Sequence, residues 1–98
     1  PASDLAVAVA VASAKLAAPV PQGMIAVGEL GLAGEVRPVP GIGRRVREAA
    51  RLGFTRALVP RSPEPLGDVP AGFTVAQVGS IGEALATIPT WTGAGAGA

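Results

Sequence analysis

The sequence predicts a single α/β or α+β domain with about four strands and three helices. Three observations indicate this class. Apolar segments of strand length alternate with segments of helical periodicity, glycines and prolines separate them, and 49% of the 98 residues are hydrophobic. A chain of this length suits one domain of ordinary size. The hydrophobic content excludes an intrinsically disordered chain, which combines low hydrophobicity with high charge.

The N-terminal segment is expected to form a helix that Ser3 or Asp4 caps and that runs to about Ala17. Alanine and valine alternate after Leu5, which is the period of a strand, but the length and alanine content of the segment favour a helix. Because this helix is apolar on every side, we expect it to be buried against a sheet or against sequence outside the chain.

The middle of the chain is expected to form a hairpin that leads into an amphipathic helix. The strands of the hairpin are placed at 24–30 and 35–39, joined by a glycine-containing turn at 31–34. Pro40 and Gly41 then break the chain, and a helix is expected at 42–52, closed by Gly53.

Two more strands and a helix are expected in the C-terminal part. The strands, at 55–60 and 73–78, flank a proline-rich loop at 61–72, and Ser80 caps a last helix that ends at Ile88. These elements define one domain over residues 1–88. Residues 89–98, which end in repeated Gly-Ala pairs, are expected to form a disordered tail.

Positive charge is concentrated in one part of the chain. The net charge is only +1, yet seven of the eight cations are arginines between positions 37 and 61, where Glu48 is the only acid. On a helical wheel, arginines occupy the outward face of the helix at 42–52. The asymmetry suggests a surface that meets an anion, with a solvated helix face as the simpler interpretation. The candidate binding residues are Arg37, Arg44, Arg45, Arg47 and Arg51.

Composition excludes most enzymatic chemistry. The chain has no Cys, His or Tyr, so disulfides, the usual zinc, iron and copper sites and most nucleophiles and general bases are absent. Gly41 and Gly43 begin a dinucleotide-like pattern, but Val46 stands where its third glycine belongs. We therefore predict no catalytic residue, no metal site and no cofactor in this chain.

A family resemblance is carried by residues 28–60, which read GELGLAGEVRPVPGIGRRVREAARLGFTRALVP. This segment resembles the proteolytic domain of Lon-type proteases. Together with the preceding PASDLAVAVAVASA, it resembles the C-terminal Lon-like domain of the RadA (Sms) family of bacterial DNA-repair proteins. The resemblance covers residues 1–88 and implies the Lon proteolytic-domain fold, which is ribosomal protein S5 domain 2-like. It also implies that the family's N-terminal strands are missing from this chain, which begins without Met and is expected to be a fragment.

Lon-type proteases use a Ser–Lys dyad, and the resemblance places Ala2 at the serine position and Gly43 at the lysine position. A dyad needs a hydroxyl within hydrogen-bond reach of an amine, and neither residue supplies one of these groups. We therefore expect a domain without peptidase activity. The alternative is a Lon-type serine peptidase whose dyad lies at other residues, with Ser3 as the first serine to test.

The resemblance implies a domain of a DNA-dependent ATPase of DNA repair and recombination. It further implies hexamer assembly and sequence-independent DNA binding, with ATP, Mg and zinc bound in parts outside this chain. DNA, further copies in a hexameric ring and RecA recombinase are the implied partners. The arginines serve either DNA or a neighbouring subunit with acids such as Asp4 or Glu83. The longest apolar run, 5–12, is too short to span a bilayer and no signal peptide is evident, so we expect a cytoplasmic protein without membrane contact.

Overall fold

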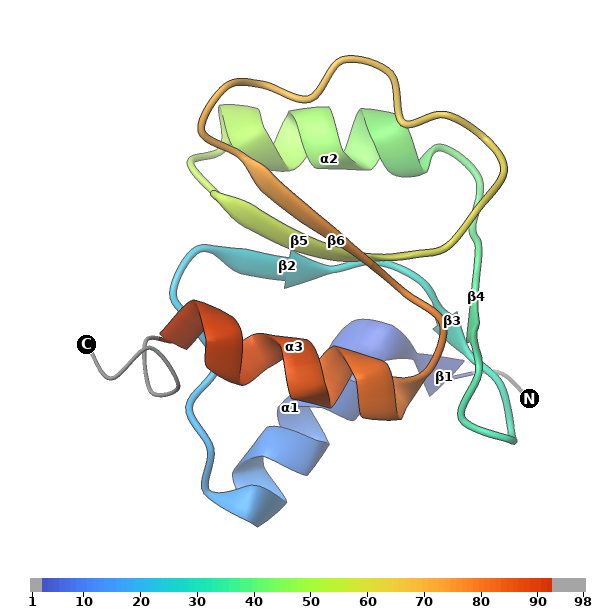
Figure 1. The fold of residues 1–98 in the computed structure, drawn as a ribbon, viewed down its shortest axis with the longest axis vertical. Coiled ribbons are helices and arrows are strands. Elements are labelled where there is room, and N and C mark those ends of the chain that lie inside the picture. The colour runs from blue at the N-terminus through green and yellow to red at the C-terminus, as the bar shows by residue number, and fades with distance from the viewer. Residues whose placement is uncertain (1–2, 93–98) are drawn as a thin grey trace.

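Two three-stranded sheets and three helices form residues 3–92, the part of the chain that the computed structural model describes (Figure 1). The parallel sheet has the order β2-β5-β6, with β2 at Met24–Ala26, β5 at Arg56–Pro60 and β6 at Thr74–Val78. The antiparallel sheet has the order β1-β3-β4, with β1 at Ser3–Asp4, β3 at Glu29–Leu30 and β4 at Val36–Arg37. The helices are α1 at Leu5–Leu16, α2 at Ile42–Arg51 and α3 at Ile81–Thr92.

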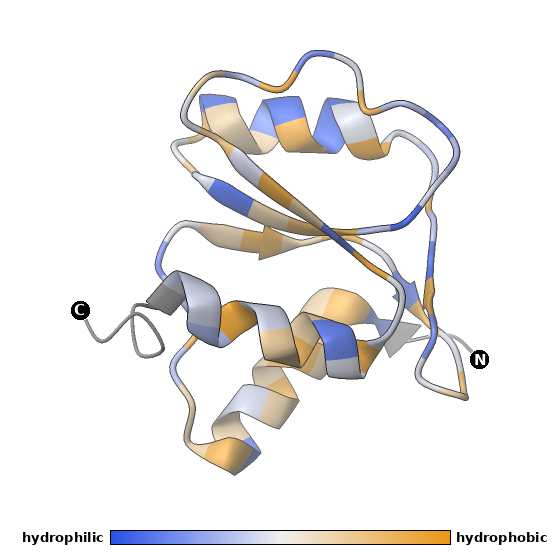
Figure 2. Ribbon diagram, in the orientation of Figure 1, coloured by the Kyte–Doolittle hydropathy of each residue, from blue (hydrophilic) through white to orange (hydrophobic). Residues whose placement is uncertain are grey.

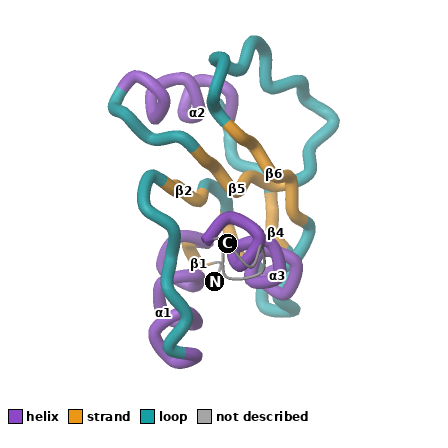
Figure 3. Tube along the Cα trace, turned by 60° about the vertical axis from the view of Figure 1, so that its left-hand side comes forward, coloured by secondary structure: helices purple, strands orange, loops and turns teal. Residues whose placement is uncertain are grey.

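The helices cover the two faces of the parallel sheet. Helix α2 lies on one face, and α1 and α3 lie on the other, an arrangement visible from two directions (Figures 1 and 3). The layers follow from the alternation of side chains along β5, which is the central strand. Ala57 and Val59 pack in the cluster under α2, whereas Leu58 packs in the cluster with α1 and α3.

In the parallel sheet, residues that lie opposite one another on neighbouring strands belong to the same hydrophobic cluster. Ala57 lies opposite Ile25 on β2 and Val75 on β6, and all three belong to the cluster on the α2 side. Leu58 lies opposite Ala26 and Ala76 in the other cluster. A strand that is buried on both faces has a continuous run of apolar residues in its sequence. Such a run is why the segment at 55–60 predicts a strand.

Helix α1 forms as expected, although only one side of it is covered by the described residues. The Asp4 carboxylate accepts hydrogen bonds from the backbone N–H groups of Ala6, at 2.7 Å, and Val7, at 3.3 Å, and so caps the helix. Val9 is buried against the sheet and α3, but Val7 and Val11 are 60% and 51% exposed. The helix is therefore buried against the sheet on one side, as expected, while Val7 and Val11 on its other side are exposed within residues 3–92. The apolar helix appears largely orange in Figure 2.

The single strand expected at 24–30 is divided between the two sheets. The chain bends at Gly28, whose φ of 144° is a conformation that favours glycine. A Cβ at this position would lie 3.1 Å from Pro60 and 3.3 Å from Val36, so the bend is also closely packed. After the bend, β3 pairs with both β4 and β1, and β1 is a strand that the sequence did not indicate. The strand expected at 35–39 is likewise limited to β4.

The C-terminal helix extends beyond its expected end at Ile88 and includes Pro89. Its last turn is held by Arg56, which donates a hydrogen bond to the carbonyl oxygen of Trp91 and lies 5.8 Å from the centre of the Trp91 ring. Residues 89–92 are therefore helical rather than part of a tail. The prediction of disorder for 93–98 lies outside the described residues.

Leu58 tests the importance of the central strand. Replacing this fully buried residue with alanine should lower the free energy of unfolding by about 2–5 kcal/mol, because it removes apolar contacts between the sheet and two helices. Urea unfolding followed by the fluorescence of Trp91, the only tryptophan, measures the change. The matched control is Leu32→Ala at an 89% exposed turn position, expected to change stability by less than about 0.5 kcal/mol. Equal effects of the two substitutions would contradict this description of the core.

Candidate functional site

Helix α2 presents four of the five predicted binding arginines. Ile42, Val46 and Ala49 repeat at helical spacing and are buried against the parallel sheet, which turns the arginines outward. The helix therefore shows blue patches on its outer side in Figure 2. The exposed arginines of α2, hereafter the arginine face, are Arg44, Arg45, Arg47 and Arg51.

The fifth predicted residue, Arg37, lies on β4 and is paired with Glu35, the residue that precedes this strand. Its guanidinium donates two hydrogen bonds to the Glu35 carboxylate, at 2.6 and 3.2 Å. The hydrogen bond from Arg37 is the main cause that lowers the pKa of Glu35. Arg37 is therefore less available to an external anion than the sequence suggested.

The arginine face itself contains paired and unpaired residues. Arg51 forms a 3.0 Å ion pair with Glu48. Arg47 donates a 2.9 Å hydrogen bond to the carbonyl oxygen of Leu66, in the loop between β5 and β6. Arg44 and Arg45 have no hydrogen-bond or ion-pair partner within residues 3–92.

Arg44 and Arg45 occupy the first turn of α2, where positive charge is unfavourable. The first turn carries the partial positive charge of the helix dipole and has no acidic residue, and its N-cap, Gly41, provides no side-chain acceptor. Arg45 also lines a cavity of about 220 Å³ that includes Asp4 and Glu29. Since two cations destabilise this helix end, a bound anion is the natural partner that would offset them.

The two acids considered as subunit partners are already used within the chain. Asp4 caps α1, as described above. Glu83 is bound by both terminal nitrogens of Arg61, one of them at 2.6 Å, and accepts a 2.7 Å hydrogen bond from the N–H of Gly79. Arg61, and next the Gly79 N–H, lower the pKa of Glu83 to about 2.

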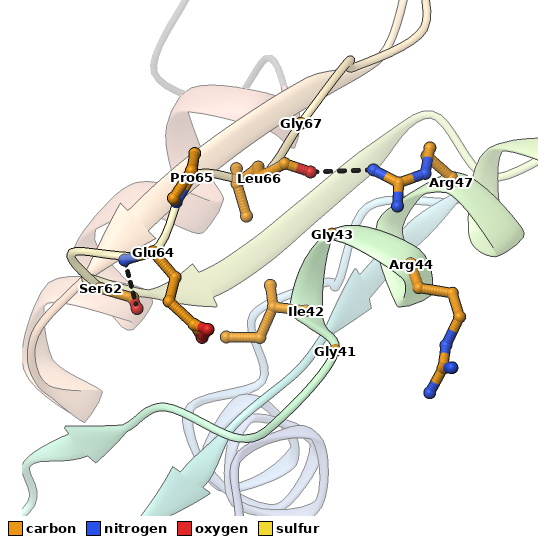
Figure 4. A pocket seen from close by; sticks show the side chains of 10 residues that line it. All are labelled: Gly41, Ile42, Gly43, Arg44, Arg47, Ser62, Glu64, Pro65, Leu66 and Gly67. Atoms are coloured by element: carbon orange, nitrogen blue, oxygen red, sulfur yellow. Dashed lines mark hydrogen bonds between the residues drawn. The ribbon is translucent and has the colours of Figure 1, made fainter.

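A cleft of about 520 Å³ separates the first turns of α2 from residues 62–67 of the loop (Figure 4). Arg47 reaches across it to Leu66, whereas the guanidinium of Arg44 points away from the loop (Figure 4). Glu64 lines the loop side. The sequence predicts a loop at 61–72 but does not indicate that this loop lies beside the arginines. The only local sign of its packing is Leu66, a single leucine within a stretch of prolines and glycines.

Gly43, the residue at the family's lysine position, lies directly beneath that loop. A Cβ at this residue would overlap the carbonyl oxygen of Leu66 and lie 3.0 Å from the Leu66 carbonyl carbon. A side chain at position 43 would therefore require the loop to move. Ala2, at the serine position, lies outside the described residues.

Residues 3–92 contain neither a cluster of metal ligands nor a helix able to span a membrane. The described residues include no group of three or more acids placed to hold a metal ion. Within the same residues, no helix combines the length and the apolar character that crossing a membrane requires.

The chain belongs to a known family. The sequence profile described as subunit ChlI of Mg-chelatase matches residues 1–63, and the chain is a member of that family. Its mixed α/β architecture, with three helices, a parallel sheet and a small antiparallel sheet in the described residues, is that of a ChlI/Lon-like domain.

Within this family, the chain is homologous to the bacterial DNA repair protein RadA. It is 43% identical to that of Mycobacterium tuberculosis over 97% of the chain and 22% of the relative. It is 48% identical to that of Mycolicibacterium smegmatis, over 90% of the chain and 18% of the relative. For Listeria monocytogenes the identity is 48%, over 87% and 19%. The chain thus spans about a fifth of these curated relatives, and the resemblance to RadA inferred from the sequence is confirmed.

The Glu83 ion pair should make stability depend on pH. Because the pKa of Glu83 is lowered to about 2 in the folded chain and is near 4.5 without its partners, the stabilisation is present above about pH 4.5 and is lost as pH falls toward 2. Glu83→Gln should therefore be less stable than the wild type at pH 6, and the difference should shrink as pH falls. Urea midpoints measured between pH 2 and 6 test this. The control is Glu64→Gln, because Glu64 has no ion pair within residues 3–92. A constant difference between wild type and Glu83→Gln would contradict the assignment.

Proposed function

We propose that the chain is a non-catalytic Lon-like domain of a RadA-type ATPase of DNA repair and recombination, and that it binds DNA through the arginine face. One observation carries the proposal: Arg44 and Arg45 are exposed, have no partner among residues 3–92 and lie at the positive end of a helix. The guanidinium fork matches phosphate oxygens, and an anion there would also offset the cost of two cations in the first turn.

The chemistry of the arginine face favours contact with phosphates rather than bases. Helix α2 has no aromatic residue, so it offers no platform on which bases could stack. Binding through guanidinium groups alone is independent of sequence and sensitive to salt.

The use of Asp4 and Glu83 within the chain makes these two acids poorer partners for the arginines of a neighbouring subunit, which supports DNA over a contact with either of them. An acid that already caps a helix or accepts from Arg61 must give up that bond to bind an arginine of another copy. We assign hexameric ring assembly, the second role proposed for the domain, to surfaces other than the arginine face.

The packing at Gly43 supports a domain without peptidase activity. The backbone of Leu66 fills the space that a lysine side chain at this position would enter. A peptidase dyad therefore lacks both the amine and the room for it, while Ala2 has no hydroxyl.

The remaining features of a RadA-type protein belong to the part of the relatives that this chain does not span. There we place DNA-dependent ATP hydrolysis with Mg and a zinc-binding segment. RecA recombinase is the proposed protein partner, and the cytoplasm is the proposed location.

Removal of the unpaired arginines should weaken DNA binding and its salt dependence. For Arg44→Ala/Arg45→Ala, the log–log slope of affinity against salt should fall by about 1.8, which corresponds to two phosphate contacts. Fluorescence anisotropy of a labelled duplex across a salt series measures the slope. The matched control, Arg37→Ala/Arg51→Ala, removes the same charge from arginines that are paired with Glu35 and Glu48, and should have a smaller effect. Equal slopes for the wild type and the Arg44/Arg45 variant would assign these arginines to another partner.

The chain should not hydrolyse peptides. With casein or a fluorogenic peptide as substrate, the wild type and Ser3→Ala should both show only the rate of the blank, because the dyad positions hold Ala2 and Gly43. Turnover by the wild type that disappears in Ser3→Ala would establish the peptidase alternative instead.

A further inference from the structure

The loop at 61–72, hereafter the strap, runs alongside α2 and is held to it at few points. It joins the parallel strands β5 and β6 (Figure 1). Leu66 is its anchor, since its side chain packs in the cluster under α2 and its carbonyl accepts the hydrogen bond from Arg47. Most of the remaining strap residues are exposed, and a cleft of about 520 Å³ lies between the strap and the helix.

The strap reduces the positive charge that the arginine face offers to an anion. It holds Arg47 through a hydrogen bond to the Leu66 carbonyl, which occupies one of the five N–H donors of the guanidinium and directs the side chain toward the strap (Figure 4). It also carries Glu64 and Asp68, which are exposed and have no ion pair within residues 3–92. Glu64 lines the cleft together with Arg44 and Arg47, so the strap places a carboxylate in the space that a polyanion bound to these arginines would enter.

We infer that the strap is an autoinhibitory element of the arginine face, and this inference rests on the proposed binding of DNA. In the closed form seen here, Arg47 is bound to Leu66. Nucleic acid competes for Arg47 through its phosphates, and the strap lifts when Arg47 exchanges the Leu66 carbonyl for a phosphate oxygen. Binding therefore includes the cost of lifting the strap, and any change that loosens it should increase affinity.

Gly43 provides a way to open the strap without changing the charge of the chain. In Gly43→Ala the new Cβ would overlap the Leu66 carbonyl oxygen, so the strap must move away from α2. Gly82→Ala is a matched control, because Gly82 is likewise the second residue of its helix, and a Cβ there meets only the Ser80 hydroxyl at an ordinary 3.8 Å.

The experiment is a double-mutant cycle between Gly43→Ala and Arg47→Gln, read by anisotropy of a labelled duplex across a salt series. Gly43→Ala should bind at least about threefold more tightly than the wild type at low salt, with a slope steeper by about 0.9, because Arg47 becomes an additional phosphate contact. Arg47→Gln should remove this gain in the Gly43→Ala background and should cost less in the wild type. Gly82→Ala should behave as the wild type.

Two results would overturn the inference and are distinguishable from each other. If the wild type and Gly43→Ala bind with equal affinity and slope, or if Arg47→Gln costs the same in both backgrounds, the strap does not restrict binding. If no variant binds duplex at any salt concentration, the proposed function itself is wrong.

Circular dichroism and Trp91 fluorescence show whether Gly43→Ala folds. Should it not, Leu66→Ala takes its place in the cycle, because it removes the side chain that packs the strap against the cluster under α2 while keeping the backbone carbonyl. Val69→Ala, at an exposed residue of the strap, is its control.

Discussion

Burial of β5 on both faces is the constraint on which the rest of this structure depends. Leu58 faces α1 and α3, while Ala57 and Val59 face α2, so a helical layer is required on each side of one strand. Parallel neighbours cannot be joined by tight hairpins, and the crossover from β2 to β5 is what places α2 over the sheet. Because α2 runs back against the direction of β5, its first turn lies at the end of β5 where the strap begins. The arginine face and the strap are therefore neighbours as a consequence of the topology.

Most arginines of residues 3–92 are held by other residues of the chain, and only a few are available to an external anion. The ion pair of Arg61 with Glu83 links the end of β5 to α3, and Arg37 pairs with Glu35 just before β4. Arg56 holds the end of α3 through Trp91. Within residues 3–92, Arg44 and Arg45 have no hydrogen-bond or ion-pair partner, and they lie at the first turn of α2, where the helix dipole opposes them. A chain with a net charge of only +1 can thus present a locally positive surface, because seven of its eight cations lie between positions 37 and 61, where Glu48 is the only acid.

In the proposed domain without peptidase activity, position 43 fails to provide the dyad lysine for two physical reasons. The amine is absent because the residue has no side chain, and the space is absent because the Leu66 backbone fills it. The same close approach links this position to the strap, so the glycine that excludes a dyad also permits the closed arrangement of the arginine face. Family resemblance and packing therefore support the same conclusion by independent arguments.

The sequence by itself determined the features that depend on local periodicity and composition. The α/β class, the amphipathic pattern of α2 and the central strand at 55–60 could all be predicted, because burial of one helix face or both strand faces leaves a pattern in consecutive residues. The outward direction of Arg44 and Arg45 followed from the same pattern. Their lack of partners did not, since that depends on where every acid in the described chain lies.

The contacts between residues that are distant in the sequence could not be predicted and became evident only in the folded chain. The bend at Gly28 divides one apparent strand between two sheets, because Pro60 and Val36 pack against it from other parts of the chain. The Arg47–Leu66 hydrogen bond spans 19 residues and the Arg61–Glu83 pair spans 22. Local propensity carries no information about such contacts, which exist only once the sheet has brought their elements together. For this reason the sequence predicts α2 as an arginine-rich helix and residues 61–72 as a loop, but it does not predict that this loop lies beside α2.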